Sequence, residues 1–270
     1  MSPGPDEQNV ANTIWGLATL GWQAAEGPMR GALEAAAVRV APTMNSQDVA
    51  NIVLGLATLG WQAGDGAMRG ALEGAAVRVA PSMNPQAVAN IIWGLATLGW
   101  QARDGAMRGA LEGAAVRVAP SMNAQAVANT IWGLATLGWQ AGEGPMRGAL
   151  EAAAVRVAPS MSAQAVANTI WGLATLGWQA AEGAMRGALE AAAVRVAPSM
   201  NAQNVANTIW GLATLGWQAA EAAMRGALEG AAMRVAPSMK PQDVANIIWG
   251  LEGVNVSMIT SYVAAPCGSG

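Results

Sequence analysis

The sequence predicts an all-α fold, a right-handed α-solenoid of helical hairpins, from three observations. The tryptophan of a Trp-Gly-Leu motif recurs with a spacing of 39 residues, as at Trp93, Trp132, Trp171 and Trp210. Within each repeat the apolar residues have helical spacing, and alanine is too abundant for strands. A period of this length is typical of solenoids and propellers, and the helical pattern favours the solenoid.

The first helix of each unit is expected to begin at a polar cap. Asn84 followed by Pro85 is the clearest case, because asparagine caps a helix and proline suits its first position. We expect this helix to run to about Trp100. The equivalent cap positions in the other units are Asn45, Asn123, Ser162, Asn201 and, in the first unit, Asp6.

The second helix follows a turn that is rich in glycine and acids, such as residues 103–105. It is expected to begin near Ala106 and to end before Pro120, since a residue that precedes proline avoids the helical region. Pro28 and Pro145 stand at the equivalent first-turn position, which supports this starting point.

The chain is expected to form one repeat domain over residues 1–265. Its last unit is truncated, and a short helix at about 256–265 is expected to cap the stack, with residues 266–270 as a disordered tail. The seven units span approximately 6–44, 45–83, 84–122, 123–161, 162–200, 201–239 and 240–265.

Composition argues against an enzyme. The 270-residue chain has no His and a single Cys, Cys267, so the usual zinc, haem and Cys/His catalytic arrangements are not expected. The carboxylates recur at fixed positions of the repeat, which does not suit a unique acid–base pair. We therefore expect no catalytic residue, no cofactor and no metal.

Charge and hydropathy indicate the surroundings in which the chain works. A single Cys favours an intracellular, reducing compartment. The longest apolar run is too short to span a membrane, and the N-terminal MSPGPDEQ resembles neither a signal peptide nor a transit peptide. The net charge of −3 counts against nucleic acid, although a local column of arginines remains compatible with it.

A helical wheel of residues 86–101 predicts which face of the first helix is open. Nearly every position is apolar, as expected for an inner helix packed against its hairpin partner and both neighbouring units. The polar arc should then face the concave surface of the superhelix. It contains Gln86, Asn90, Gly94, Thr97 and Gln101.

The repeat resembles a known family. The stretch PQAVANIIWGLATLGW at residues 85–100, followed by an acid-Gly turn and an Ala/Leu-rich helix, is similar to the octotricopeptide repeat of algal organelle proteins. The resemblance covers about residues 6–252, with Gly94 where the family usually has alanine. It implies an α-solenoid that binds organellar RNA, one nucleotide per repeat, in chloroplast or mitochondrial gene expression. The copies are unusually alike, as in a recent expansion or a consensus-based design.

Two positions of the first helix vary between units: Ala87 at the edge of the polar arc and Ile91 just beyond it. One hypothesis is that this pair reads one RNA base per repeat. The alternative is structural, because Asp or Asn suits a helix start and a Thr/Ile exchange is a tolerated swap. The candidate readout residues are Asn9, Thr13, Asp48, Ile52, Ala87, Ile91, Ala126, Thr130, Ala165, Thr169, Asn204, Thr208, Asp243 and Ile247.

Two further columns lie in or beside the arc. One asparagine occurs in every unit and either contacts bases or satisfies backbone groups between repeats. The tryptophans either pack the interior or stack on bases. The asparagines are Asn12, Asn51, Asn90, Asn129, Asn168, Asn207 and Asn246.

The second helices carry two arginine columns. The first, which contains Arg108, has a glutamate four residues later as an ion-pair partner. The second has no acid on its face; it either complements the helix dipole or tracks a phosphate backbone. These phosphate candidates are Arg39, Arg78, Arg117, Arg156, Arg195 and Arg234.

The sequence therefore predicts a monomeric, sequence-selective binder of single-stranded RNA that reads about six or seven nucleotides. Its affinity should fall gently with salt. A scaffold that holds a protein or peptide on the same concave arc is the alternative, and a structural or designed repeat without a ligand is a third possibility. No membrane partner is expected.

Overall fold

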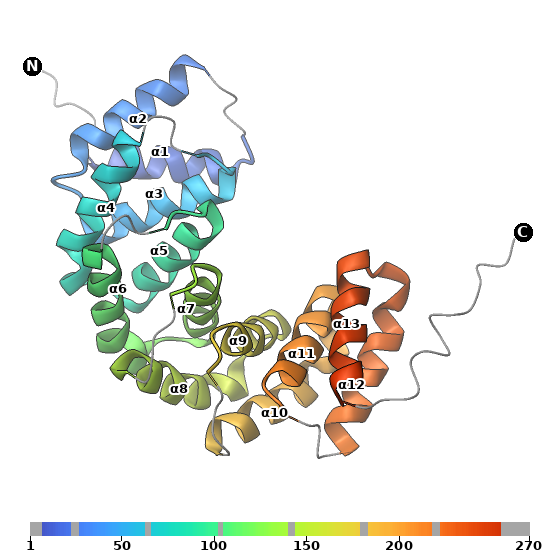
Figure 1. The fold of residues 1–270 in the computed structure, drawn as a ribbon. Coiled ribbons are helices and arrows are strands. Elements are labelled where there is room, and N and C mark those ends of the chain that lie inside the picture. The colour runs from blue at the N-terminus through green and yellow to red at the C-terminus, as the bar shows by residue number, and fades with distance from the viewer. Residues whose placement is uncertain are drawn as a thin grey trace, which may run out of the picture.

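The structure, a computed structural model, describes residues 7–22, 27–62, 66–101, 105–139, 144–178, 183–217 and 222–254. These residues form α-helices joined by turns and short 3₁₀ segments, and consecutive helices pair and stack along a curved array (Figure 1). The predicted α-solenoid of helical hairpins is confirmed.

One helix of each hairpin lies on the inside of the curve (Figure 1). Neighbouring inner helices contact one another far more extensively than neighbouring outer helices do, as expected where a stack bends toward its inner side. The inner helices are α1 (Glu7–Thr19), α3 (Ser46–Leu59), α5 (Pro85–Leu98), α7 (Ala124–Thr136), α9 (Ala163–Thr175), α11 (Ala202–Thr214) and α13 (Pro241–Val254).

The outer helices follow the convex side. Five of them run into a 3₁₀ turn made of Ala-Pro-Ser, which leads to the next inner helix. The outer helices are α2 (Pro28–Val40), α4 (Ala67–Val79), α6 (Gly105–Val118), α8 (Pro145–Val157), α10 (Ala184–Val196) and α12 (Ala222–Val235). The 3₁₀ turns are η1 (Ala80–Ser82), η2 (Ala119–Ser121), η3 (Ala158–Ser160), η4 (Ala197–Ser199) and η5 (Ala236–Ser238).

The ends of the inner helices follow from local chemistry. In α5 the side chain of Asn84 accepts the main-chain N–H of Ala87 at 2.8 Å, which satisfies one free amide of the first turn. Gly99 ends the helix with a φ of 64°, a left-handed conformation that glycine adopts without strain. The N–H of Trp100 then donates to the carbonyl of Leu95 at 2.9 Å. The helix therefore stops shortly before the predicted end at Trp100.

A glycine sets the close approach of the inner helices. A Cβ added to Gly133 would lie 2.7 Å from Cγ2 of Ile92 and 3.0 Å from the carbonyl oxygen of Ile92 in the preceding inner helix. At Gly16 in α1, no atom lies within 4 Å of the added Cβ. The glycine of the Trp-Gly-Leu motif is therefore required by the adjacent helix. The equivalent contacts involve Gly55, Gly94, Gly172, Gly211 and Gly250.

Three sequence predictions lie outside the described residues: the cap at Asp6, the helix at about 256–265 and the tail at 266–270. Of the helices that the structure describes, none combines the length and the apolar character that crossing a membrane requires.

Candidate functional site on the concave face

A narrow stripe of each inner helix is left uncovered by its neighbours. In α5 the side chains of Gln86 and Thr97 are exposed, and those of Asn90 and Trp93 are half-buried. These residues are separated by four, three and four positions, so they lie on one side of the helix. We call these four positions in every unit the concave stripe. It shares Gln86, Asn90 and Thr97 with the predicted arc and adds Trp93. Gly94 is instead buried against the neighbouring helix, and Gln101 lies beyond the end of α5 at Leu98.

The tryptophans of the concave stripe form a continuous ladder. From Trp93 to Trp249, successive ring centroids are 6.4, 6.4, 6.3 and 5.9 Å apart, with ring planes inclined by 34–35°. In the second unit Leu54 takes this place and separates Trp15 from the ladder. The rings are half-buried from Trp93 to Trp210 and exposed at Trp249. Both interpretations of this column, packing and ligand contact, are compatible with this burial.

The asparagine column does not form the predicted bonds between repeats. The side chains of Asn12, Asn51, Asn90, Asn129, Asn168 and Asn207 make no hydrogen bond with the protein in the described ranges. In the last unit Asn246 accepts a hydrogen bond from Nε2 of Gln242 at 3.1 Å, within the stripe itself. The amides of the first six asparagines are therefore available to a ligand. For these six residues, the interpretation that the asparagines satisfy backbone groups between repeats is wrong.

The candidate readout residues are not at the rim of a surface. From the second unit onward, the first position is 3–8% exposed and the second is 0–4% exposed. Only Asn9 and Thr13 are exposed, since no described helix packs on that side of α1. The wheel placed these positions at the edge of the arc, but the glycine-mediated approach of the inner helices encloses them. The buried residues are Asp48, Ile52, Ala87, Ile91, Ala126, Thr130, Ala165, Thr169, Asn204, Thr208, Asp243 and Ile247.

At the first varying position, polar residues act on the helix start. Oδ2 of Asp48 accepts the N–H of Asn45 at 3.0 Å while Asn45 caps the helix in return, a capping box. Asn204 makes the reciprocal bond at 3.3 Å, and Asp243 accepts the N–H of Lys240 at 2.9 Å. The structure therefore favours the helix-start interpretation of this position.

At the second varying position the threonine hydroxyls turn back to their own helix. Thr130 and Thr169 donate to the carbonyl four residues earlier, each at 2.7 Å. Thr208 is the exception: its hydroxyl is buried and has no hydrogen-bond partner. Among the described residues from the second unit onward, the hydroxyls at this position are therefore buried inside the stack and do not face a ligand.

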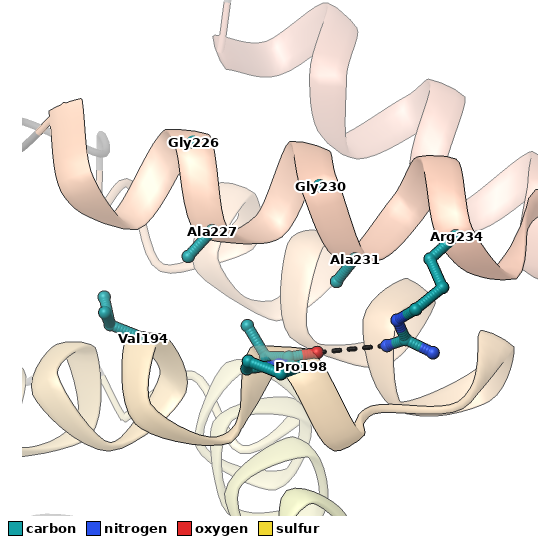
Figure 2. A pocket seen from close by; sticks show the side chains of 8 residues that line it. Val194, Pro198, Gly226, Ala227, Gly230, Ala231 and Arg234 are labelled. Carbon is teal, nitrogen blue, oxygen red and sulfur yellow. Dashed lines mark hydrogen bonds between the residues drawn. The ribbon is translucent and has the colours of Figure 1, made fainter.

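The second arginine column is bonded to backbone, yet remains exposed. Nη2 of Arg78 donates to the carbonyls of Ala41 at 3.0 Å and Met44 at 2.7 Å, in the turn that precedes α3. Arg117, Arg156, Arg195 and Arg234 repeat both bonds at 2.6–3.2 Å, and Figure 2 shows the one from Arg234 to the carbonyl of Ala197. These arginines therefore hold consecutive units together at the edge where the inner helices begin. Arg39, in the first unit, is also exposed.

The first arginine column joins each outer helix to the following unit. Nε of Arg69 lies 2.8 Å from Oε1 of Glu73, and the guanidinium lies over the ring of Trp100 at 5.6 Å from its centroid. Arg69 also donates to the carbonyl of Gln101. Sequence reasoning did not foresee this contact between the first arginine column and the second tryptophan column, to which Trp100 belongs. The signal that could have revealed the contact is the constant sequence separation between each arginine and the tryptophan that it contacts.

The convex side offers little chemistry. A groove between α10 and α12 is lined mainly by glycine, alanine and other small apolar residues, with Arg234 at one end (Figure 2). Within the described ranges, no cluster of His, Cys, Asp and Glu is suited to hold a metal ion. The concave stripe is therefore the candidate functional site.

No protein-family model matches this chain, and none of the curated proteins with which it was compared matches it either. The resemblance to the octotricopeptide repeat stays a prediction. The helical-repeat scaffold is established by the fold alone.

Proposed function

We propose that the concave stripe binds single-stranded RNA, with bases against the tryptophan ladder and the amide columns. The observation that carries this proposal is the repetition, beside the ladder, of an asparagine whose amide has no partner in the described structure. Helical-repeat RNA-binding proteins use two or three side chains of each repeat for one base, and aromatic rings supply stacking. The octotricopeptide resemblance points to the same ligand.

The pitch of the ladder favours an extended strand over a duplex. Successive rings are 5.9–6.4 Å apart. Stacked bases advance by only about 3.4 Å along each strand. One base per unit therefore requires bases that have left their stack, which a single strand permits and a duplex does not.

The second arginine column is suited to the phosphates. It follows the edge where the inner helices begin, next to the glutamine end of the stripe, because its bonds end on the residue before each cap. In the described part of the chain, the hydrogen bonds of these arginines are made by Nη2, which leaves the other N–H groups to meet an anion. A few such contacts on a chain of net charge −3 should give a shallow salt dependence.

The test is fluorescence anisotropy with a labelled mixed-sequence single strand of about 14 nucleotides, twice the predicted site, and the same RNA as a duplex. We expect binding to the single strand only. The triple variant Asn90→Ala, Asn129→Ala and Asn168→Ala should bind at least about tenfold more weakly, because each amide would contribute to base contact. Its helix content and unfolding midpoint should be unchanged, since these amides have no protein partner to lose.

A matched control places three substitutions on the convex side. Gly109→Ala, Gly148→Ala and Gly187→Ala add methyl groups to open space on the outer helices. They should leave the RNA affinity unchanged. A second variant, Arg156→Gln, should reduce the slope of log K against log salt by about 0.7, the value for one lost phosphate contact on a single strand. An unchanged slope would remove the arginine column from the site.

A peptide ligand is the alternative that the same experiment decides. None of the four stripe positions carries a charge, which suits an extended peptide, and two residues of a strand advance by about 6.6 Å, close to the ladder pitch. The second arm therefore selects a displayed peptide library on the wild-type chain and on the triple asparagine variant. Enrichment on the wild type alone, without RNA binding, would overturn the RNA proposal in favour of a peptide scaffold.

A further inference from the structure

The concave stripe presents the same chemistry in nearly every unit. The glutamine and the asparagine are present in all seven units, and the threonine in the first six. The ladder position is tryptophan everywhere except at Leu54. The glutamines are Gln8, Gln47, Gln86, Gln125, Gln164, Gln203 and Gln242.

The positions that could distinguish one unit from another are enclosed. From the second unit onward, the Asp/Asn/Ala position and the Thr/Ile position are at most 8% exposed. Apart from the buried Thr208 hydroxyl, which has no hydrogen-bond partner, their polar groups bond to the caps and carbonyls of their own helices, as at Asp48 and Thr130. A ligand on the concave face therefore meets repeated, identical contact groups, at a ladder spacing of 5.9–6.4 Å.

We propose that the preferred ligand is a uniform RNA tract, and specifically a run of adenosines. This inference rests on the proposed function. A mixed sequence offers different edges to identical units, so most units would be mismatched, whereas a homopolymer matches all of them. An amide presents one donor beside one acceptor, which pairs in bidentate fashion with N6–H and N7 of adenine. The characteristic partners of guanine and cytosine, arginine and a carboxylate, are absent from the four stripe positions.

A uniform tract that binds to identical units can sit in several equivalent registers. Affinity should rise steeply with length until the units are filled, at about five to seven nucleotides under one base per unit. Beyond that length it should rise only in proportion to the number of registers in which the tract can sit. A site built from different readers would instead show one preferred register and no such linear increase.

The interruption at Leu54 provides a gain-of-function test. Leu54→Trp should join Trp15 to the rest of the ladder, raise the affinity for an adenosine tract by about fivefold or more, and lengthen the site by up to two units. Trp93→Leu is the matched change in the opposite direction: it should weaken binding and shorten the ladder. Asn90→Asp, which replaces the amide donor by an acceptor, should reduce affinity without removing side-chain volume.

The experiment compares adenosine, uridine and cytidine homopolymers of about 12 nucleotides with alternating A/C and mixed-sequence strands, together with a length series of adenosine tracts. The adenosine tract should bind at least about tenfold more tightly than the alternating and mixed strands. Equal binding of mixed and uniform strands would overturn the inference while leaving RNA binding intact. A preference for uridine or cytidine would overturn the adenine assignment. Failure of every RNA to bind would instead remove the proposed function.

Discussion

Replacing Gly133 by alanine tests the packing on which the whole architecture depends. The new Cβ would lie 2.7 Å from Cγ2 of Ile92 and 3.0 Å from its carbonyl oxygen. The side chain of Ile92 is fully buried and the carbonyl is backbone, so relief requires the two inner helices to separate. Overpacking of this kind costs about 1–3 kcal/mol.

Helix propensity acts in the opposite direction. Alanine is favoured over glycine inside a helix by roughly 0.5–1 kcal/mol. The net effect of Gly133→Ala should therefore be a destabilisation of up to about 2.5 kcal/mol. Gly113→Ala isolates the propensity term, because nothing lies within 4 Å of its added Cβ and the equivalent Ala152 occurs naturally. That control should be more stable than the wild type.

The assay is urea unfolding followed by circular dichroism, with hydrogen exchange to locate the loss. Repeat arrays unfold approximately as coupled units, so the exchange rates should increase in α5 and α7 and much less at the ends of the stack. A second control, Gly16→Ala, places the same change in α1, where the Cβ meets nothing. If Gly133→Ala stabilised the protein as much as these controls, the close approach of the inner helices would be refuted.

Three further changes test the interior. Thr208→Val should stabilise the protein by about 1 kcal/mol, because it removes a buried hydroxyl that has no hydrogen-bond partner. Thr130→Val removes a hydroxyl that is hydrogen-bonded and should be neutral or destabilising. The denaturant midpoints of the two variants measure this difference. Asp48→Ala should cost about 1 kcal/mol of stability through loss of the capping box, and it should leave RNA affinity unchanged in anisotropy titrations. An altered RNA preference would show that Asp48 does take part in base readout. Trp100→Phe should cost about 1–3 kcal/mol in thermal or urea unfolding, since it removes the N–H that donates to Gln62 and part of the ring beneath the guanidinium.

Sequence patterns predicted the local structure well because local chemistry determines it. The Asn84 cap, the first-turn proline at Pro145 and the end of the outer helix before Pro120 all depend on residues within one turn. The repeat period then predicted that this hairpin recurs along the chain as an array. The wheel also predicted the three polar positions of the stripe, the exposed Gln86 and Thr97 and the half-buried Asn90.

The site was harder to predict because exposure depends on the distance between neighbouring units. A wheel treats Ala87 and Ile91 as borderline, and only the contact made possible by Gly94 shows that they are enclosed. The role of Arg117 was also hidden, since its carbonyl partners belong to the previous unit, 34 and 37 residues earlier in the chain. In the sequence, arginines that make such contacts recur with the same period as arginines that lie on a solvated surface, so the pattern does not distinguish the two.

The glycine of the Trp-Gly-Leu motif links stability, spacing and recognition. It brings the inner helices close enough to enclose the varying positions, and the same approach sets the 6.4 Å step from Trp93 to Trp132. An array with alanine there would need a wider separation between the inner helices. That separation would both stretch the ladder and uncover the position next to the arc. Gly133→Ala should therefore weaken ligand binding across that step as well as destabilise the stack. A loss of stability with unchanged ligand affinity would show that the ladder spacing does not control recognition.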